Sequence, residues 1–153
     1  MTKMTIVDVI NIVYPNQISL GNVTLGCADG VNIFITSWNV PNESEPTVQS
    51  LLDMIPSLQH QFDLDYFKSV GNVQLMQYLN VVANEREYDT AISCTSYSSS
   101  TILQWKSEAD VFISWRDSVF AYTIEQIALM ESGQRSIPTF EEFKTELPVI
   151  VWP

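Results

Sequence analysis

Basic side chains are scarce in this chain. Seven lysines and arginines stand against 18 aspartates and glutamates, which gives a formal net charge of −11 at pH 7 over 153 residues. Nucleic acids and anionic membranes are bound through positively charged surfaces. The composition therefore argues against both kinds of partner.

Metal-binding and disulfide-forming residues are also few. Cys27 and Cys94 are the only cysteines, and His60 is the only histidine. Two thiols do not make a disulfide framework; they leave open two free thiols or one bridge, within or between chains. His60 has no cysteine or acidic pair near it at metal-ligand spacing. We expect no metal site and no cofactor.

Catalytic motifs are missing as well. The chain contains no G-x-S-x-G, H-E-x-x-H or G-x-G-x-x-G pattern. The serine-rich run at residues 96–100 has no base in its own segment, so it is better explained as a solvated loop than as a nucleophile. We expect a binding or assembly protein with no catalytic residues.

The apolar content is high enough for one packed core. Apolar residues make up 46% of the chain and aromatic residues 11%, and the length suits a single core better than two ordinary domains. Asp8 and Asn11 interrupt the first apolar run, which is therefore neither a signal peptide nor a membrane span. Synthesis in a cytoplasm is the expectation.

Strand patterns dominate residues 1–40. The dipeptide Asp29-Gly30 predicts a tight hairpin turn. Gly21-Asn22 predicts a kink, bulge or turn within the strand that leads into this hairpin. Isoleucine and valine enrichment predicts a buried first strand. The expected unit is a three-stranded antiparallel meander. Its strands are expected over residues 5–13, 18–28 and 31–38.

Helical patterns follow over residues 41–153. Thr47 caps a short helix that Pro56 is expected to end, and the helical pattern then continues with a break at Gly71. A short helix is predicted over residues 89–93. The predicted fold is α+β, with a β-meander subdomain (1–40) followed by a helical subdomain (41–153).

Two capping boxes mark the last two helices. Thr101-x-x-Gln104 is expected to start a long aromatic helix that ends at the αL cap Gly133. Thr139-x-x-Glu142 is expected to start the final helix, which Pro148 stops. The fold prediction therefore centres on a helical bundle with one long aromatic helix.

The long helix supplies three candidate partner-binding residues. Its bulky rings span too much of the helix circumference to be buried in a small bundle, so Trp115 or Tyr122 is expected to face a second surface. Arg116 falls inside the apolar stripe. It either pairs with an acid such as Asp89 or Glu108, or contacts a partner.

The chain ends on an apolar strip, residues 147–153, with little left to cover it. Val149, Ile150 and Trp152 are the candidate partner-binding residues of this strip. Such a strip is expected to be buried against the chain itself or against a partner.

Several segments resemble small tail-fibre-module proteins of tailed bacteriophages. The resemblance lies in residues 88–97, 112–122 and 132–148, and it covers roughly residues 77–148. The junction from Trp38 to Thr47 looks like the strand-to-helix hinge of such proteins. The ending, residues 150–153, is similar to that of tail-fibre assembly proteins.

This resemblance implies a non-enzymatic protein that binds a trimeric tail fibre or a baseplate protein. It implies either an assembly chaperone in the host cytoplasm or a small subunit of the virion tail. Association with further copies of the chain stays open. The alternative is a carbohydrate- or receptor-binding module at the fibre tip.

Overall fold

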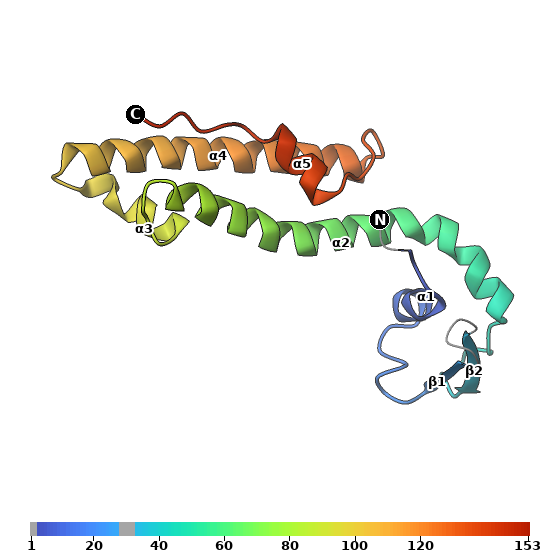
Figure 1. The fold of residues 1–153 in the computed structure, drawn as a ribbon. Helices are drawn as coiled ribbons and strands as arrows, with labels where there is room; N and C mark the ends of the chain where they lie inside the picture. The colour runs from blue at the N-terminus through green and yellow to red at the C-terminus, as the bar shows by residue number, and fades with distance from the viewer. Residues whose placement is uncertain (1–2, 28–32) are drawn as a thin grey trace. The chain divides into compact units, whose positions relative to one another are not determined.

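A computed structural model describes residues 3–27 and 33–153. The chain forms two compact units, the N-terminal unit (residues 1–63) and the helical unit (residues 64–153). The predicted boundary between residues 40 and 41 follows the change from strand to helix patterns and stays a prediction. The elements of the described residues are α1 (Ile6–Val13), β1 (Val23–Cys27), β2 (Ile33–Trp38), α2 (Val48–Asn84), α3 (Ala91–Ser96), η1 (Tyr97–Ser99), α4 (Leu103–Glu131) and α5 (Phe140–Glu146) (Figure 1).

The first element is a helix, so the predicted strand over residues 5–13 is wrong. Thr5 caps α1 by a capping box, in which the Asp8 carboxylate accepts the Thr5 backbone N–H at 2.7 Å. Ile6, Val9 and Ile10 fall on one face of the helix and are buried. The cap and the burial of this face outweigh the strand preference of isoleucine and valine.

Over residues 3–27 and 33–153 the sheet has two antiparallel strands, so the predicted three-stranded meander is wrong. Gly21 has a φ of 75° and lies in a turn, which delays β1 until Val23. The predicted middle strand over residues 18–28 is therefore shortened at its start, because residues 18–21 form turns and not the first half of a split strand. β1 and β2 pair from Val23↔Trp38 to Cys27↔Ile33 with a bulge between Thr24 and Leu25. The predicted Asp29-Gly30 turn lies outside the described residues.

A small core holds the N-terminal unit together. It joins α1, the sheet and the first turns of α2, and its largest fully buried side chains include Met4, Ile10 and Leu51. A Cβ on Gly26 would lie 2.5 Å from the ring of Phe34, so only glycine at this position of β1 leaves room for the ring to pack against the strand. The protein therefore remains a mixture of helices and sheet, with fewer strands than predicted.

Helix α2 continues through two positions where the sequence predicts an end or a break. Pro56 lies inside the helix, where it removes one backbone hydrogen bond. Gly71 also lies inside it, and a Cβ there would meet only Phe140 and Phe67, at 3.9 and 4.0 Å. Buried side chains on both sides of Pro56, such as Leu51 and Leu64, hold the helix together despite the lost bond.

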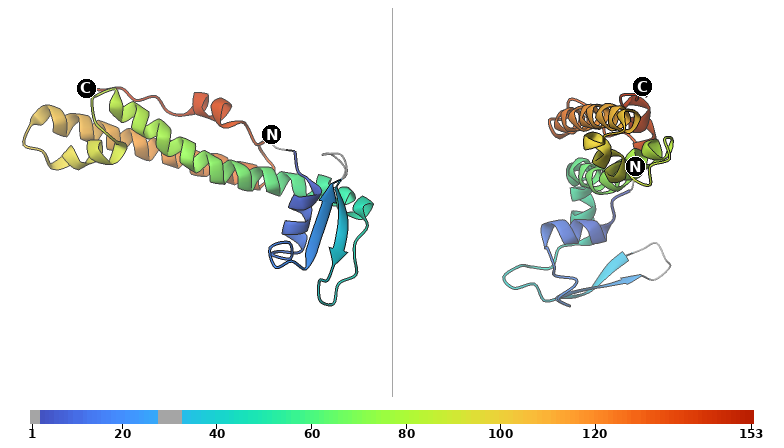
Figure 2. Two further views of the ribbon diagram at one scale, coloured as in Figure 1. Left: turned by 60° about the horizontal axis from the view of Figure 1, so that its bottom comes forward. Right: turned by 90° about the vertical axis from the view of Figure 1, so that its left-hand side faces the viewer.

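The helical unit is built on two antiparallel helices. The later part of α2 lies beside α4, with α3 and η1 at the turn between them, and α5 and residues 147–153 lie along the pair (Figures 1 and 2). Side chains from all these elements share one core, including the fully buried Leu79, Phe112, Val119 and Phe143. The C-terminal part of the chain is therefore mostly helical, as the sequence predicts.

Local capping signals account for most helix ends in this unit. Thr139 and Glu142 form the predicted capping box of α5, and Gly133 follows α4 with a φ of 71°, as predicted. Helix α4 instead begins at Leu103, and the Ser100 hydroxyl accepts the backbone N–H of Ile102. The predicted Thr101 cap is therefore wrong.

One carboxylate is buried in the helical core. Glu108 is 5% exposed and accepts hydrogen bonds from the Tyr88 hydroxyl at 2.7 Å and the Gln104 amide at 3.1 Å. Burial, together with the Glu108 charge, raises the pKa of the Cys94 thiol to about 11. Cys94 and the exposed Cys27 are both free thiols.

We predict that Gly71→Ala stabilises the protein by about 0.5–1 kcal/mol, because alanine loses less backbone entropy in a helix and its methyl group finds room beside Phe140. Gly133→Ala is the matched control. It should destabilise by about 1 kcal/mol, because residue 133 has a positive φ. Urea unfolding measures both changes, and a less stable Gly71→Ala variant would contradict the prediction.

Candidate functional site

Residues 147–153, the apolar strip, leave α5 in an extended conformation. Leu147 has φ −63° and ψ 145°, and Pro148 cannot continue the helix. Leu147 is 5% exposed, whereas Val149 is 83% and Val151 is 81% exposed. Ile150 and Trp152 are half-buried against the helical core. Side chains beyond Pro148 thus alternate between solvent and core, as in a strand with one covered face.

Trp115 fixes the start of the strip. Its indole is 6% exposed, and Nε1 donates a hydrogen bond to the Pro148 carbonyl oxygen at 2.7 Å. The ring lies edge-on to Tyr78, with the centroids 5.9 Å apart, and 5.3 Å from Phe112. The structure therefore places Trp115 in the core, beneath the strip.

Trp152 anchors the other end of the strip by three contacts. Its ring stacks on Phe112 with a centroid distance of 6.0 Å and an interplanar angle of 17°. Nε1 donates to Glu85 at 3.3 Å, and the Arg86 guanidinium carbon lies 5.4 Å from the ring centroid. Glu85 and Arg86 are neighbours in the turn that follows α2, so they hold the indole from the end of that helix.

Tyr122 helps to hold the end of α5 against α4. Its hydroxyl donates to a Glu146 carboxylate oxygen at 2.6 Å, and Arg135 Nη2 donates to both oxygens of that carboxylate at 2.7 Å. Two hydrogen bonds lower the pKa of Glu146: the one from Tyr122 has the larger effect and the one from Arg135 the smaller. This network fixes the point from which the strip departs.

Arg116 pairs with its neighbour in sequence. Its Nε and Nη2 donate to one carboxylate oxygen of Asp117 at 3.0 and 2.8 Å. The expected acidic partners Asp89 and Glu108 do not take part in this pair. Arg116 is half-buried and lies on α4 apart from the strip's anchoring contacts, so the structure does not bring it together with Val149, Ile150 and Trp152.

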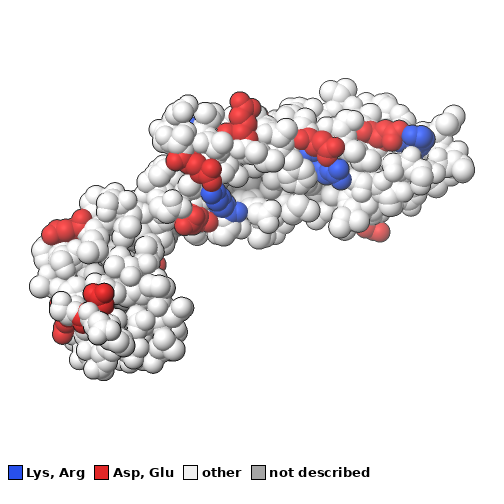
Figure 3. Space-filling model, turned by 180° about the vertical axis from the view of Figure 1, so that it is seen from behind, with Lys and Arg blue, Asp and Glu red and all other residues white. Residues whose placement is uncertain are grey.

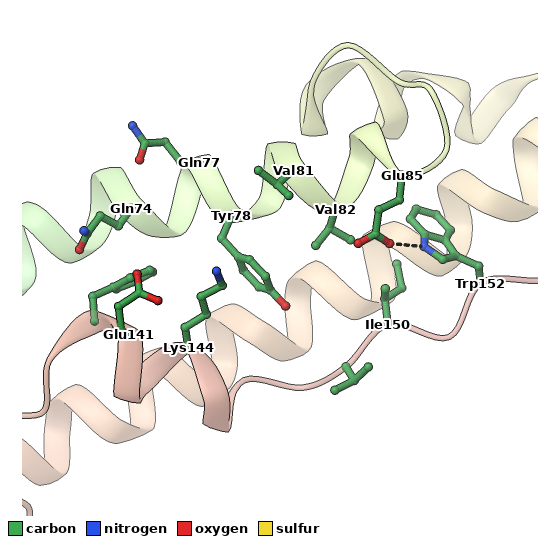
Figure 4. A pocket seen from close by; sticks show the side chains of 12 residues that line it. Gln74, Gln77, Tyr78, Val81, Val82, Glu85, Glu141, Lys144, Ile150 and Trp152 are labelled. Atoms are coloured by element: carbon green, nitrogen blue, oxygen red, sulfur yellow. Dashed lines mark hydrogen bonds between the residues drawn. The ribbon is translucent and has the colours of Figure 1, made fainter.

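A groove of about 370 Å³ runs between α2, α5 and the strip (Figure 4). Glu141 and Glu85 lie toward its two ends, with Tyr78 and Lys144 between them. The Lys144 Nζ lies 5.4 Å from the Tyr78 ring centroid. Burial, with a smaller effect of Glu85, raises the pKa of Tyr78. The groove is also lined by Gln74, Gln77, Val81, Val82, Phe140, Val149, Ile150 and Trp152.

Every cation of the helical unit contacts a group of its own chain. Residues 64–153 contain six basic and twelve acidic side chains. Arg86 and Lys144 lie over aromatic rings. On the face seen in Figure 3, the larger blue groups lie beside red ones. The four ion pairs are Lys68–Glu131, Lys106–Asp110, Arg116–Asp117 and Arg135–Glu146.

The structure gives the predicted partner-binding residues different places, and their role in binding stays a prediction. Trp115, Tyr122, Ile150 and Trp152 hold the strip in place, and Val149 faces solvent. Val151 and the groove carboxylates Glu85 and Glu141 are not among the residues predicted from the sequence. The two-residue alternation after Pro148 is a signal that points to Val151. No comparable signal brings together carboxylates that lie more than fifty residues apart.

No cluster of three or more histidine, cysteine or acidic side chains is placed for metal binding in residues 3–27 and 33–153. Over those same residues, no helix is both long and apolar enough to cross a membrane. No protein-family model, curated protein or solved structure matches the chain.

We predict that Trp115→Phe destabilises the protein by about 1–2 kcal/mol, because it removes the indole donor to Pro148 and leaves a gap in the core. Trp105→Phe is the control, since Trp105 is on the same helix and is 41% exposed. Urea unfolding gives the stability change, and the indole N–H resonance of Trp152 reports on the strip. An effect no larger than that of Trp105→Phe would contradict the prediction.

The lowered pKa of Glu146 predicts a pH-dependent contribution to stability. This contribution is fully present above about pH 4.3, the ordinary value of a glutamate, and is lost as the pH falls through the lower value of the folded state. Glu146→Gln should therefore destabilise at pH 7 by no more than about 1 kcal/mol, because solvent screens this pair.

The difference between wild type and Glu146→Gln should shrink at pH 3. Urea unfolding at both pH values measures it. Glu125→Gln makes the same charge change at an exposed position of α4 and serves as the control. A Glu146→Gln effect that stays constant between pH 7 and pH 3 would show that the carboxylate charge is not responsible.

Proposed function

We propose that this chain is a non-enzymatic tail-fibre-associated protein that binds the tail fibre or baseplate of a tailed bacteriophage. It would act as an assembly chaperone or as a small subunit of the virion tail. The observation that carries the binding role is the anchored strip, which presents Val149 and Val151 to solvent. The sequence resemblance of residues 77–148 supports the choice of partner.

The geometry of the strip suits binding to an apolar protein surface. Fully burying a valine side chain contributes about 1.5–3 kcal/mol, before the costs of association. Trp115 and Trp152 already hold the strip extended, so a partner need not order it. Two outward valines on a fixed strip thus form a small, pre-organised contact surface.

The charge distribution agrees with a protein partner. The helical unit has a surplus of carboxylates, and its cations are engaged within the chain. A nucleic acid would meet few available positive groups. A protein partner with exposed lysine or arginine side chains would complement this surface.

A carbohydrate- or receptor-binding module at the fibre tip is the second candidate. The groove favours it to the extent that its lining includes an aromatic ring, Tyr78, and two amide side chains, Gln74 and Gln77. Lys144, however, already lies over that ring. Binding of the isolated protein to a glycan array, lost in Trp152→Ala, would support this candidate over the fibre-binding one.

The fibre-binding proposal is tested by reversing the polarity of the outward side chains. Val149→Asp/Val151→Asp should reduce capture of the co-expressed tail-fibre protein of the same phage at least about tenfold, since two apolar contacts are lost. Ile124→Asp is the control, because Ile124 is 69% exposed on α4. Unchanged capture and unchanged yield of soluble fibre in the double variant would refute the proposal.

Mass spectrometry of purified virions separates the two forms of the proposal. A defined copy number in the particle would identify a tail subunit. Recovery of the fibre from infected-cell lysate by the tagged protein, with none of the protein in virions, would identify a chaperone. Neither fibre capture nor presence in virions would contradict both forms.

A further inference from the structure

We infer that the strip binds an extended segment of its protein partner by strand addition, along the backbone edge of Val149 and Val151, and that a basic side chain of that segment is held by the groove carboxylates. This inference rests on the proposed function and deepens it. It names the kind of contact and the chemistry of the segment that binds.

The first observation is an unpaired backbone. Within the described part of the chain, residues 149–153 make no backbone–backbone hydrogen bond. The side chains of this segment alternate between solvent and core, as side chains do along a strand with one covered face. An extended backbone with free N–H and C=O groups is a template for another strand.

The second observation shows which edge is free. The Pro148 carbonyl accepts the Trp115 indole, so it points toward α4. In an extended segment, alternate residues direct their carbonyl groups to the same side. The carbonyl and N–H groups of Val149 and Val151 therefore face away from α4. Ile150 and Trp152 point from the strip toward the groove, so side chains on that same face of an added strand would point toward the groove as well (Figure 4).

The third observation is the charge of the groove. Among the described residues, the Glu141 carboxylate makes no hydrogen bond or ion pair. The Glu85 carboxylate accepts only the hydrogen bond from the Trp152 indole N–H. The groove's own cation, Lys144, lies over Tyr78. A strand laid along the edge would pass these carboxylates, which favour a lysine or arginine side chain.

The test is a selection from a yeast-displayed library of random dodecapeptides against the full chain. The expected peptides carry alternating β-branched or aromatic residues together with a lysine or arginine. Val151→Pro removes the backbone donor and should raise their dissociation constant about tenfold, whereas Val151→Thr keeps the donor, loses only part of one apolar contact and should raise it clearly less than Val151→Pro does. Val151 is exposed, so neither change disturbs the core.

The charge assignment has its own pair of variants. Glu141→Lys should weaken the same peptides about tenfold, and Glu125→Lys on α4 should leave them unchanged. An absence of enriched peptides, or equal binding to wild type and Val151→Pro, would overturn strand addition. Sensitivity to Val151→Pro without sensitivity to Glu141→Lys would overturn the assignment of the basic side chain.

These outcomes are distinct from failure of the proposed function. Fibre capture that depends on the valine side chains but tolerates Val151→Pro would leave fibre binding intact and overturn strand addition. Peptide binding that depends on the Val151 donor, with no capture of the fibre, would support the strand contact and refute the tail fibre as the partner.

Discussion

The position of the strip depends on one buried hydrogen-bond donor. The indole N–H of Trp115 lies in the core of the helical unit, where a donor without an acceptor would cost about 1–3 kcal/mol. The Pro148 carbonyl supplies that acceptor because proline has already ended α5 and left its own carbonyl free. Chain direction after α5 is therefore set by the need to satisfy Trp115, and Trp152 then completes the attachment.

Short-range signals were the most predictable part of this fold. The capping box of Thr139 and Glu142 and the positive φ of Gly133 depend on neighbours within a few residues, and both are present as predicted. The strand prediction for residues 5–13 was wrong because the composition of this segment favours a strand, while the spacing of its apolar residues also fits a helix. The prediction that Pro56 ends a helix was wrong because buried side chains on both sides of Pro56 compensate for the one lost backbone hydrogen bond.

The sequence predicted which segment forms the candidate site, but not which side chains of the folded chain contact that segment. An apolar strip after Pro148 is visible in the sequence, but whether Trp115 lies under it depends on packing between α4 and residues far along the chain. Similarly, Glu85 lies in the turn after α2 and Glu141 lies in α5, and only the folded unit places them along one groove. Pairwise contacts at such separations leave no local pattern in a single sequence.

The engagement of all six cations in the helical unit has a kinetic consequence. Four of these cations are neutralised by neighbouring carboxylates, and two lie over aromatic rings. The electric field of the surplus acidic groups therefore dominates at longer range. Copies of the protein therefore repel one another in dilute buffer. A basic partner would be drawn in faster than by diffusion alone, and added salt would slow its association while affecting its dissociation much less.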